Sequence, residues 1–133
     1  MKVMIDTNLL VYAWDSGDKE KQSKAIDLLR RHKNQACLSV QNLSEFSAVM
    51  IRKGADLNWL KRVISIYSEI MYVLPLTSNE VKQAIHAVDK YGMSFWDAQI
   101  WAVAKAHAIP VILTEDGPTG REIEGVWFKN PLN

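Results

Sequence analysis

Short apolar runs alternate with longer amphipathic stretches along this chain. An apolar run of four or five residues that is bounded by polar turn residues predicts a buried β-strand. Such runs cover residues 2–5, 36–40, 72–76, 111–114 and 126–129. Between them, apolar residues recur every three or four positions, which predicts helices over residues 9–12, 19–33, 41–53, 58–71, 77–91 and 94–108. Strands that alternate with helices favour a parallel sheet and an α/β fold.

Individual residues indicate where several of these elements end. Gly54 and Gly92 are suited to the left-handed conformation that ends a helix. Thr77 and Glu80 have the spacing of a capping box at a helix start. Pro75 cannot donate a backbone hydrogen bond, so the strand around it is expected to end there or to lie at a sheet edge.

The predicted helix at 94–108 contains five alanines. Small side chains allow a helix to approach its neighbours closely, so we expect this helix to pack under the sheet. The run at 111–114 that follows it is then expected to be the central buried strand.

Length and composition limit the possibilities. The 133 residues predict a single domain over residues 1–133. A net charge of +1 offers no bulk attraction for nucleic acid, so any such binding would need local basic patches. The one cysteine, Cys37, excludes an internal disulfide and is expected in the core. No apolar run has the ~20 residues of a membrane span and no signal peptide is visible, so a cytoplasmic location is expected.

Four acidic residues lie near the predicted ends of strands or starts of helices: Asp6, Glu45, Asp97 and Asp116. In open α/β sheets, ligands bind at the carboxyl ends of the strands, so these side chains are expected to meet there. Two carboxylates ~4 Å apart repel by about 4 kcal/mol at an effective dielectric of ~20. A pocket that holds several of them therefore implies a divalent cation or bound protons.

Each of the four acids also has an ordinary structural explanation. Asp6 can cap the short helix that follows it. Asp97 follows Ser94 at the spacing of a capping pattern, and Asp116 forms a common turn pair with Gly117. The glutamate falls nearly opposite the apolar stripe of its helix, where it would face solvent. Their joint placement, more than any single position, favours a functional site.

Four strings along the chain carry a family resemblance: MIDTNLLVY, SVQNLSEF, YGMSFWDAQIWAVA and LTEDGPTGREIEGVWFKNP. In their order and spacing they resemble PIN-domain ribonucleases, specifically the VapC-like toxins of type II toxin–antitoxin systems. The resemblance implies a three-layer α/β/α fold with a central, mostly parallel sheet. It also implies an endoribonuclease that uses Mg²⁺ or Mn²⁺.

The resemblance assigns roles to residues. Asp6, Glu45, Asp97 and Asp116 would be the catalytic acids, with Asp6 and Asp97 as the main metal ligands and the other two as possible further ligands. The supporting polar residues would be Thr7, Asn8 and Thr114. Because Glu115 and Asp116 are adjacent, either could complete the acidic set.

The resemblance also implies partners. These are an RNA substrate, a cognate antitoxin whose C-terminal segment lies across the active site, and a second copy in a homodimer. Candidate contacts to the RNA backbone are Arg52, Lys53 and Arg121. Candidate apolar residues for the antitoxin are Leu10, Trp14, Trp59 and Leu60, although a core position would also explain them.

Two other functions are compatible with an α/β chain of this kind. One is a catalytically inactive PIN-type binding or assembly module. The other is phosphotransfer on Asp6, but a dehalogenase-type enzyme would need a second aspartate where Asn8 stands. A receiver domain would need an aspartate after its middle strand, where Gln41 and Asn42 stand. The histidines, His32, His86 and His107, are expected to be structural or solvated.

Overall fold

The computed structural model describes residues 1–132, which form a six-stranded sheet in the order β3-β2-β1-β4-β6-β5. The strands are β1 (Val3–Ile5), β2 (Ala36–Ser39), β3 (Tyr72–Leu74), β4 (Val111–Leu113), β5 (Glu122–Ile123) and β6 (Val126–Lys129). Neighbouring strands are parallel, except that β5 pairs antiparallel with β6. The predicted, mostly parallel sheet is therefore confirmed, with β1 and β4 at its centre.

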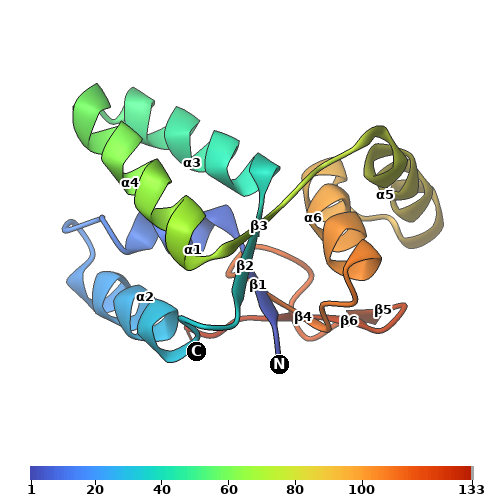
Figure 1. Cartoon of the computed structure of the whole chain (residues 1–133). Coiled ribbons are helices and arrows are strands. Elements are labelled where there is room, and N and C mark those ends of the chain that lie inside the picture. Colours follow the sequence, from blue (N-terminus) through green and yellow to red (C-terminus); the bar gives the residue numbers. More distant parts are fainter. Residues whose placement is uncertain (133) are drawn as a thin grey trace.

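Helices cover both faces of the sheet. They are α1 (Thr7–Tyr12), α2 (Lys19–Arg31), α3 (Val40–Arg52), α4 (Leu57–Ile70), α5 (Ser78–Tyr91) and α6 (Phe95–Ala106). Figure 1 shows α1 to α4 on one side of the strands and α5 with α6 on the other. This arrangement is the three-layer α/β/α architecture that the resemblance implied.

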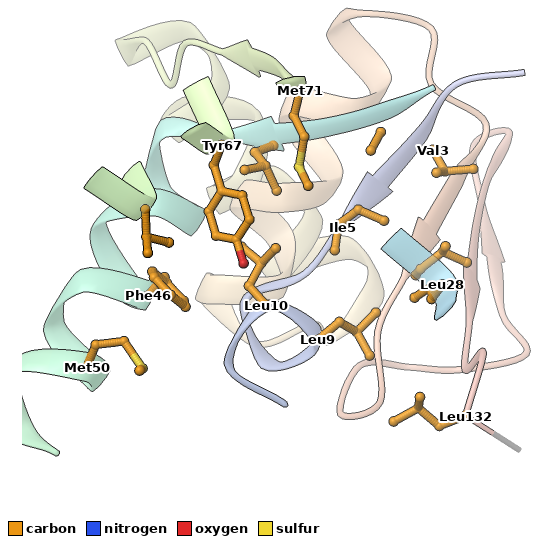
Figure 2. Close-up of a cluster of buried hydrophobic side chains, with 14 of the residues drawn as sticks. Val3, Ile5, Leu9, Leu10, Leu28, Phe46, Met50, Tyr67, Met71 and Leu132 are labelled. Atoms are coloured by element: carbon orange, nitrogen blue, oxygen red, sulfur yellow. The ribbon is translucent and has the colours of Figure 1, made fainter. Parts of the chain in front are cut away.

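The central strands are apolar throughout because successive side chains enter two different cores. In β1, Val3 and Ile5 belong to the core under α1 to α4, while Met4 belongs to the core under α5 and α6. In β4, Ile112 lies in that second core. Figure 2 shows the first core, where side chains of the strands meet Leu10 and the aromatic residues of α3 and α4.

The alanine-rich helix α6 is buried against the sheet as predicted. Its Trp101 is fully buried, and the indole N–H donates to the Ile123 carbonyl at 3.0 Å. Alanines on the same helix, such as Ala98 and Ala104, are also fully buried. The small side chains leave room for one large aromatic ring, which anchors the β5–β6 hairpin to the helix.

Two local predictions need correction, and one strand was not predicted. The strand predicted at 36–40 ends at Ser39, because Ser39 and Asn42 form a reciprocal capping box that starts α3 at Val40. The capping box predicted at the start of α5 is wrong, since the Thr77 hydroxyl donates to the Glu80 carboxylate and does not cap the backbone. Strand β5 has only two residues, too few to produce a sequence pattern.

The glycine predicted to end the fifth helix does so: Gly92 follows α5 in the left-handed conformation, with a φ of 68°. Among the helices of residues 1–132, none combines the length and apolar character needed to cross a bilayer.

Removing the Ser39 cap should destabilise the protein. We expect Ser39→Ala to lower the free energy of unfolding by about 1 kcal/mol, because the Asn42 N–H loses its buried acceptor. Urea unfolding followed by circular dichroism measures this change. Ser44→Ala, an exposed position in the same helix, is the control and should leave the midpoint almost unchanged. Equal midpoints for the two variants would contradict the capping role.

Candidate active site

The candidate site lies where the direction of chain progression across the sheet reverses. From β1 the chain adds β2 and then β3 on one side, while β4 and β6 lie on the other side of β1. Parallel sheets bind ligands at such a switch point, outside the carboxyl ends of the strands. A hollow of about 390 Å³ opens here. Its lining includes six residues singled out in the sequence: Asp6, Thr7, Asn8, Glu45, Asp97 and Asp116.

Asp6 follows β1 and is both a helix cap and a wall of the hollow. One carboxylate oxygen accepts from the Thr7 N–H at 2.7 Å, and the other accepts from the Thr114 hydroxyl at 2.7 Å. The pKa of Asp6 is raised to about 6, mainly by burial and then by the negative charges of Asp97 and Glu45, against the two hydrogen bonds. Asp6 therefore caps the helix and also belongs to the predicted site.

Asp97 lies in the first turn of α6, where its backbone N–H donates to the Ser94 hydroxyl at 3.2 Å. The predicted capping pattern is thus present, and it uses the backbone of Asp97, so its carboxylate is not needed for the cap. Partial burial raises the pKa of Asp97, followed by the charges of Asp116 and Glu45. Because the charge of Asp97 also raises the pKa of Asp6, Asp97 lies within electrostatic range of all three other acids.

Glu45 does not extend freely into solvent, so the solvent-facing interpretation is wrong. Its carboxylate accepts from the Gln41 side-chain amide at 2.6 Å and from the Thr7 hydroxyl at 3.2 Å. The Thr7 hydroxyl in turn accepts from the fully buried Asn42 amide at 3.2 Å. Gln41 and Asn42 were missed as site residues. Their only sequence signal is that two polar residues open an otherwise amphipathic helix.

Thr114 organises the loop after β4. Its hydroxyl accepts from the backbone N–H groups of Asp116 at 3.2 Å and Gly117 at 3.3 Å while it donates to Asp6. A side chain at Gly117 would come within 2.9 Å of Thr114 Cγ2 and 3.2 Å of the Phe128 ring. The chain therefore bends at Asp116 and Gly117, as expected for this residue pair. The bend brings the Asp116 carboxylate to the hollow.

Glu115 lies outside the lining of the hollow and faces a different group. It accepts from the Tyr12 hydroxyl at 2.6 Å and forms an ion pair with Lys21 at 3.0 Å. The Tyr12 hydrogen bond, followed by Lys21, lowers the pKa of Glu115. Of the two adjacent acids, the structure thus brings Asp116 together with Asp6, Glu45 and Asp97.

The other candidate residues are distributed differently. Arg121 donates to the Tyr91 carbonyl at 3.2 Å and is absent from the lining of the hollow. Leu10 and Leu60 are buried in the first core, so they are not available as partner surface. Lys53 lines a neighbouring hollow, while Arg52 is exposed at the end of α3. In residues 1–132, no histidine lines the acidic hollow.

Asn8 provides a test of whether a hydrated cation suits this site. Its amide N–H group donates to Asp116 at 3.1 Å and to Thr114 at 3.4 Å, and this fixes the orientation of the side chain. The Asn8 Oδ1 atom is left buried without a partner in residues 1–132. A water bound to Mg²⁺ can donate a hydrogen bond to such an oxygen. Oxygen donors are also the ligands that hard cations prefer, so the donor set fits.

The acids share the hollow more loosely than a closed metal cage would require. Within residues 1–132, no three Asp, Glu, His or Cys side chains are gathered tightly enough to hold an ion as they stand. Magnesium sites commonly use one or two carboxylates together with several waters.

The fold and the site define an α/β protein with a carboxylate-lined hollow at the switch point of a parallel sheet. A family profile described as PIN domain matches residues 3–117. The chain therefore belongs to the PIN-domain family. A search of curated proteins found no significant match.

Solved structures with the same fold include toxins and toxin–antitoxin complexes. A Mycobacterium tuberculosis VapC toxin, described as cleaving the sarcin–ricin loop, has a TM-score of 0.74 at 20% identity, covering 88% of this chain and 92% of the toxin. A toxin–antitoxin complex from Klebsiella pneumoniae matches with a TM-score of 0.70 at 20% identity, covering 98% of both chains. A DNA-bound VapBC complex from Rickettsia felis matches with a TM-score of 0.68 at 16% identity, also covering 98% of both. These likenesses show a shared fold.

The raised pKa of Asp6 predicts a pH-dependent stability in the presence of a chelator. Because the folded pKa of about 6 exceeds the ordinary 3.8, stability that is present below pH 4 is lost as the pH rises to 6. Asp6→Asn removes the charge and keeps a good capping residue. Its stability relative to the unmodified chain should therefore increase by roughly 2 kcal/mol between pH 4 and pH 7.

Urea unfolding across this pH range measures the effect. Asp56→Asn is the matched control, because Asp56 also caps a helix, at 2.9 Å from the Trp59 N–H, but is exposed. A difference between the Asp6 variant and the unmodified chain that stays constant with pH would refute the proposed burial penalty.

Proposed function

We propose that this chain is a metal-dependent endoribonuclease, the toxin component of a toxin–antitoxin module. The observation that carries the proposal is the meeting of four carboxylates, those of Asp6, Glu45, Asp97 and Asp116, in one hollow of a PIN-domain fold. The electrostatic coupling of Asp97 with the other three supports a shared cation site.

Asp6 and Asp97 are the proposed main ligands of Mg²⁺ or Mn²⁺, with Glu45 and Asp116 as further ligands or as acceptors for bound waters. When bound, such a cation would polarise the scissile phosphate and lower the pKa of an attacking water. Polar neighbours hold the acids in position. The Thr114 hydroxyl orients Asp6, and the Thr7 hydroxyl orients Glu45.

The acids also control when RNA can bind. An RNA phosphate that enters a hollow of several carboxylates is repelled until their charge is neutralised. Asn8 Oδ1 can accept a hydrogen bond from a water or a ribose hydroxyl in the hollow, since it has no partner in residues 1–132. Binding and cleavage of RNA should therefore both depend on the divalent cation.

A cognate antitoxin is the protein partner that we propose. Two of the similar solved structures are toxin–antitoxin complexes. A second hollow of about 350 Å³, whose lining includes Lys53, Trp14 and Trp59, shares Val11 with the acidic hollow. Trp14 and Trp59 meet edge to face at 5.0 Å, and Trp14 is 45% exposed. A partner segment that crosses both hollows could anchor on these rings and carry a basic side chain to the acids. We also propose a homodimer, which light scattering of the isolated chain would test.

The first experiment is cleavage of total cellular RNA by the purified chain with Mg²⁺ or Mn²⁺. We expect discrete cuts that disappear with chelator and fall at least ~100-fold in Asp97→Asn, because one charge of the site is lost. The fold should survive, since the backbone of Asp97 makes the Ser94 contact. Undiminished cutting by this variant would contradict the model. An absence of any cut together with an absence of metal binding by calorimetry would favour an inactive binding module.

A paired substitution separates the two adjacent acids. Asp116→Asn should reduce cleavage by at least ~100-fold, because a carboxylate in the hollow is lost. Glu115→Gln should keep most of the activity, because its amide oxygen can still accept from Tyr12 and the side chain lies outside the lining. Initial cleavage rates on the same RNA measure both. The reverse order of effects would assign the fourth acid to Glu115.

A further inference from the structure

Trp96 lies beside the acids with an exposure that its packing does not explain. Its side chain is 62% exposed, yet it lines the same hollow as Asp97. Trp101, on the same helix, shows the usual structural role of tryptophan, because it is fully buried and hydrogen-bonded. We propose that Trp96 is a stacking platform for an unpaired nucleobase next to the scissile phosphate. This inference rests on the proposed ribonuclease function and narrows its substrate to RNA with unpaired bases.

Trp96 has two neighbours, one at its ring and one at its backbone carbonyl. The Phe95 ring lies 5.7 Å from the Trp96 ring, tilted by 59°. The Gln41 side-chain amide donates to the Trp96 carbonyl at 3.5 Å and to Glu45 at 2.6 Å. Gln41 therefore connects the Trp96 backbone to one of the acids.

Gln41 also leaves an acceptor without a partner. The residue is 7% exposed. Both groups that contact its amide nitrogen are acceptors, so its orientation is fixed. Its Oε1 atom is then buried without a hydrogen bond in residues 1–132.

The composition of the hollow matches the two halves of a nucleotide. Its acids, together with a cation, suit a phosphate, whereas Val11, Val49 and Ile100 supply apolar wall. A base offers a flat π-face that stacks on an aromatic ring whatever its sequence. In a duplex both faces of each base are already covered by neighbouring bases. The platform should therefore act on unpaired nucleotides only.

Binding measurements can isolate this role of Trp96. The probes are a short oligoadenylate, an abasic ribose-phosphate chain of the same length, and the oligoadenylate hybridised to oligouridylate. Fluorescence anisotropy would be measured with Mg²⁺ before cleavage products appear. The proteins are the unmodified chain, Trp96→Ala, Trp96→Phe and the control Trp127→Ala. Trp127 is 45% exposed on β6 and does not line the hollow.

Trp96→Ala should weaken oligoadenylate binding roughly 5- to 150-fold, the range for loss of one stacked base. Trp96→Phe should retain most of the affinity, and Trp127→Ala should match the unmodified chain. Binding of the abasic chain and of the duplex should be unaffected by either Trp96 substitution. Equal losses on the abasic chain, or no loss on oligoadenylate, would overturn the inference.

Parallel cleavage assays separate this inference from the proposed function. If the unmodified chain cuts RNA and Trp96→Ala cuts it with unchanged KM, the stacking role fails while the ribonuclease stands. If oligoadenylate binding depends on Trp96 but no RNA is cut, the stacking role stands while the proposed catalysis fails.

Discussion

The parallel pairing of β1 with β4 is the constraint on which the acidic hollow depends. Its register places Ile5 beside Leu113, so the residues that follow both strands emerge at the same level. The Asp6 N–H continues this pairing with a bond to the Leu113 carbonyl at 3.0 Å, and the Thr114 hydroxyl then reaches the Asp6 carboxylate. The first acid is thus positioned by backbone pairing as well as by a side-chain contact. A one-residue slip would turn Met4 toward the wrong core and move Asp6 away from Thr114.

Several carboxylates can share this edge because the surrounding structure offsets part of their repulsion. Asp6 caps α1, and Asp97 lies in the first turn of α6. A helix N-terminus carries a partial positive charge that favours an acid. Hydroxyl and amide donors from Thr7, Thr114 and Gln41 supply further stabilisation. The pKa values of both aspartates remain raised, mainly by burial and to a smaller extent by the neighbouring carboxylates. In the function that we propose, a bound cation would neutralise this negative charge.

The sequence predicted those parts of the fold and site that depend on local rules. An acid directly after an apolar strand, as at Asp6, or in the first turn of a helix, as at Asp97, can be recognised from a few neighbouring residues. The choice between Glu115 and Asp116 could not be predicted in this way. It depends on Tyr12 and on a lysine 94 residues earlier in the chain, which only the tertiary fold brings to Glu115.

The first residue of α3 was not predicted correctly from the sequence, for a related reason. Val40 extends an apolar run and so favours a longer strand, but the reciprocal bonds of Ser39 and Asn42 begin the helix one residue earlier than predicted. Because Glu45 and Gln41 lie on this helix, the cap also sets the turns from which Glu45 reaches the hollow and Gln41 donates to it. Glu45 contacts Thr7, and Gln41 contacts the Trp96 carbonyl, so both contacts reach other helices. Helical periodicity does not include such contacts, and for this reason it predicted a solvent-facing Glu45.

The first turn of α6 shows how one element can carry both chemistry and recognition. Consecutive residues on a helix point about 100° apart, so Asp97 is half-buried among the acids while Trp96 lies at the more exposed rim. Ser94 fixes the start of this turn, and the buried face of α6, including Trp101, fixes its position on the sheet. The backbone positions of Trp96 and Asp97 are therefore fixed relative to each other. A base that stacks on Trp96 would therefore hold the adjoining phosphate at a constant position relative to Asp97, which is the positional accuracy that hydrolysis of a single phosphodiester bond requires.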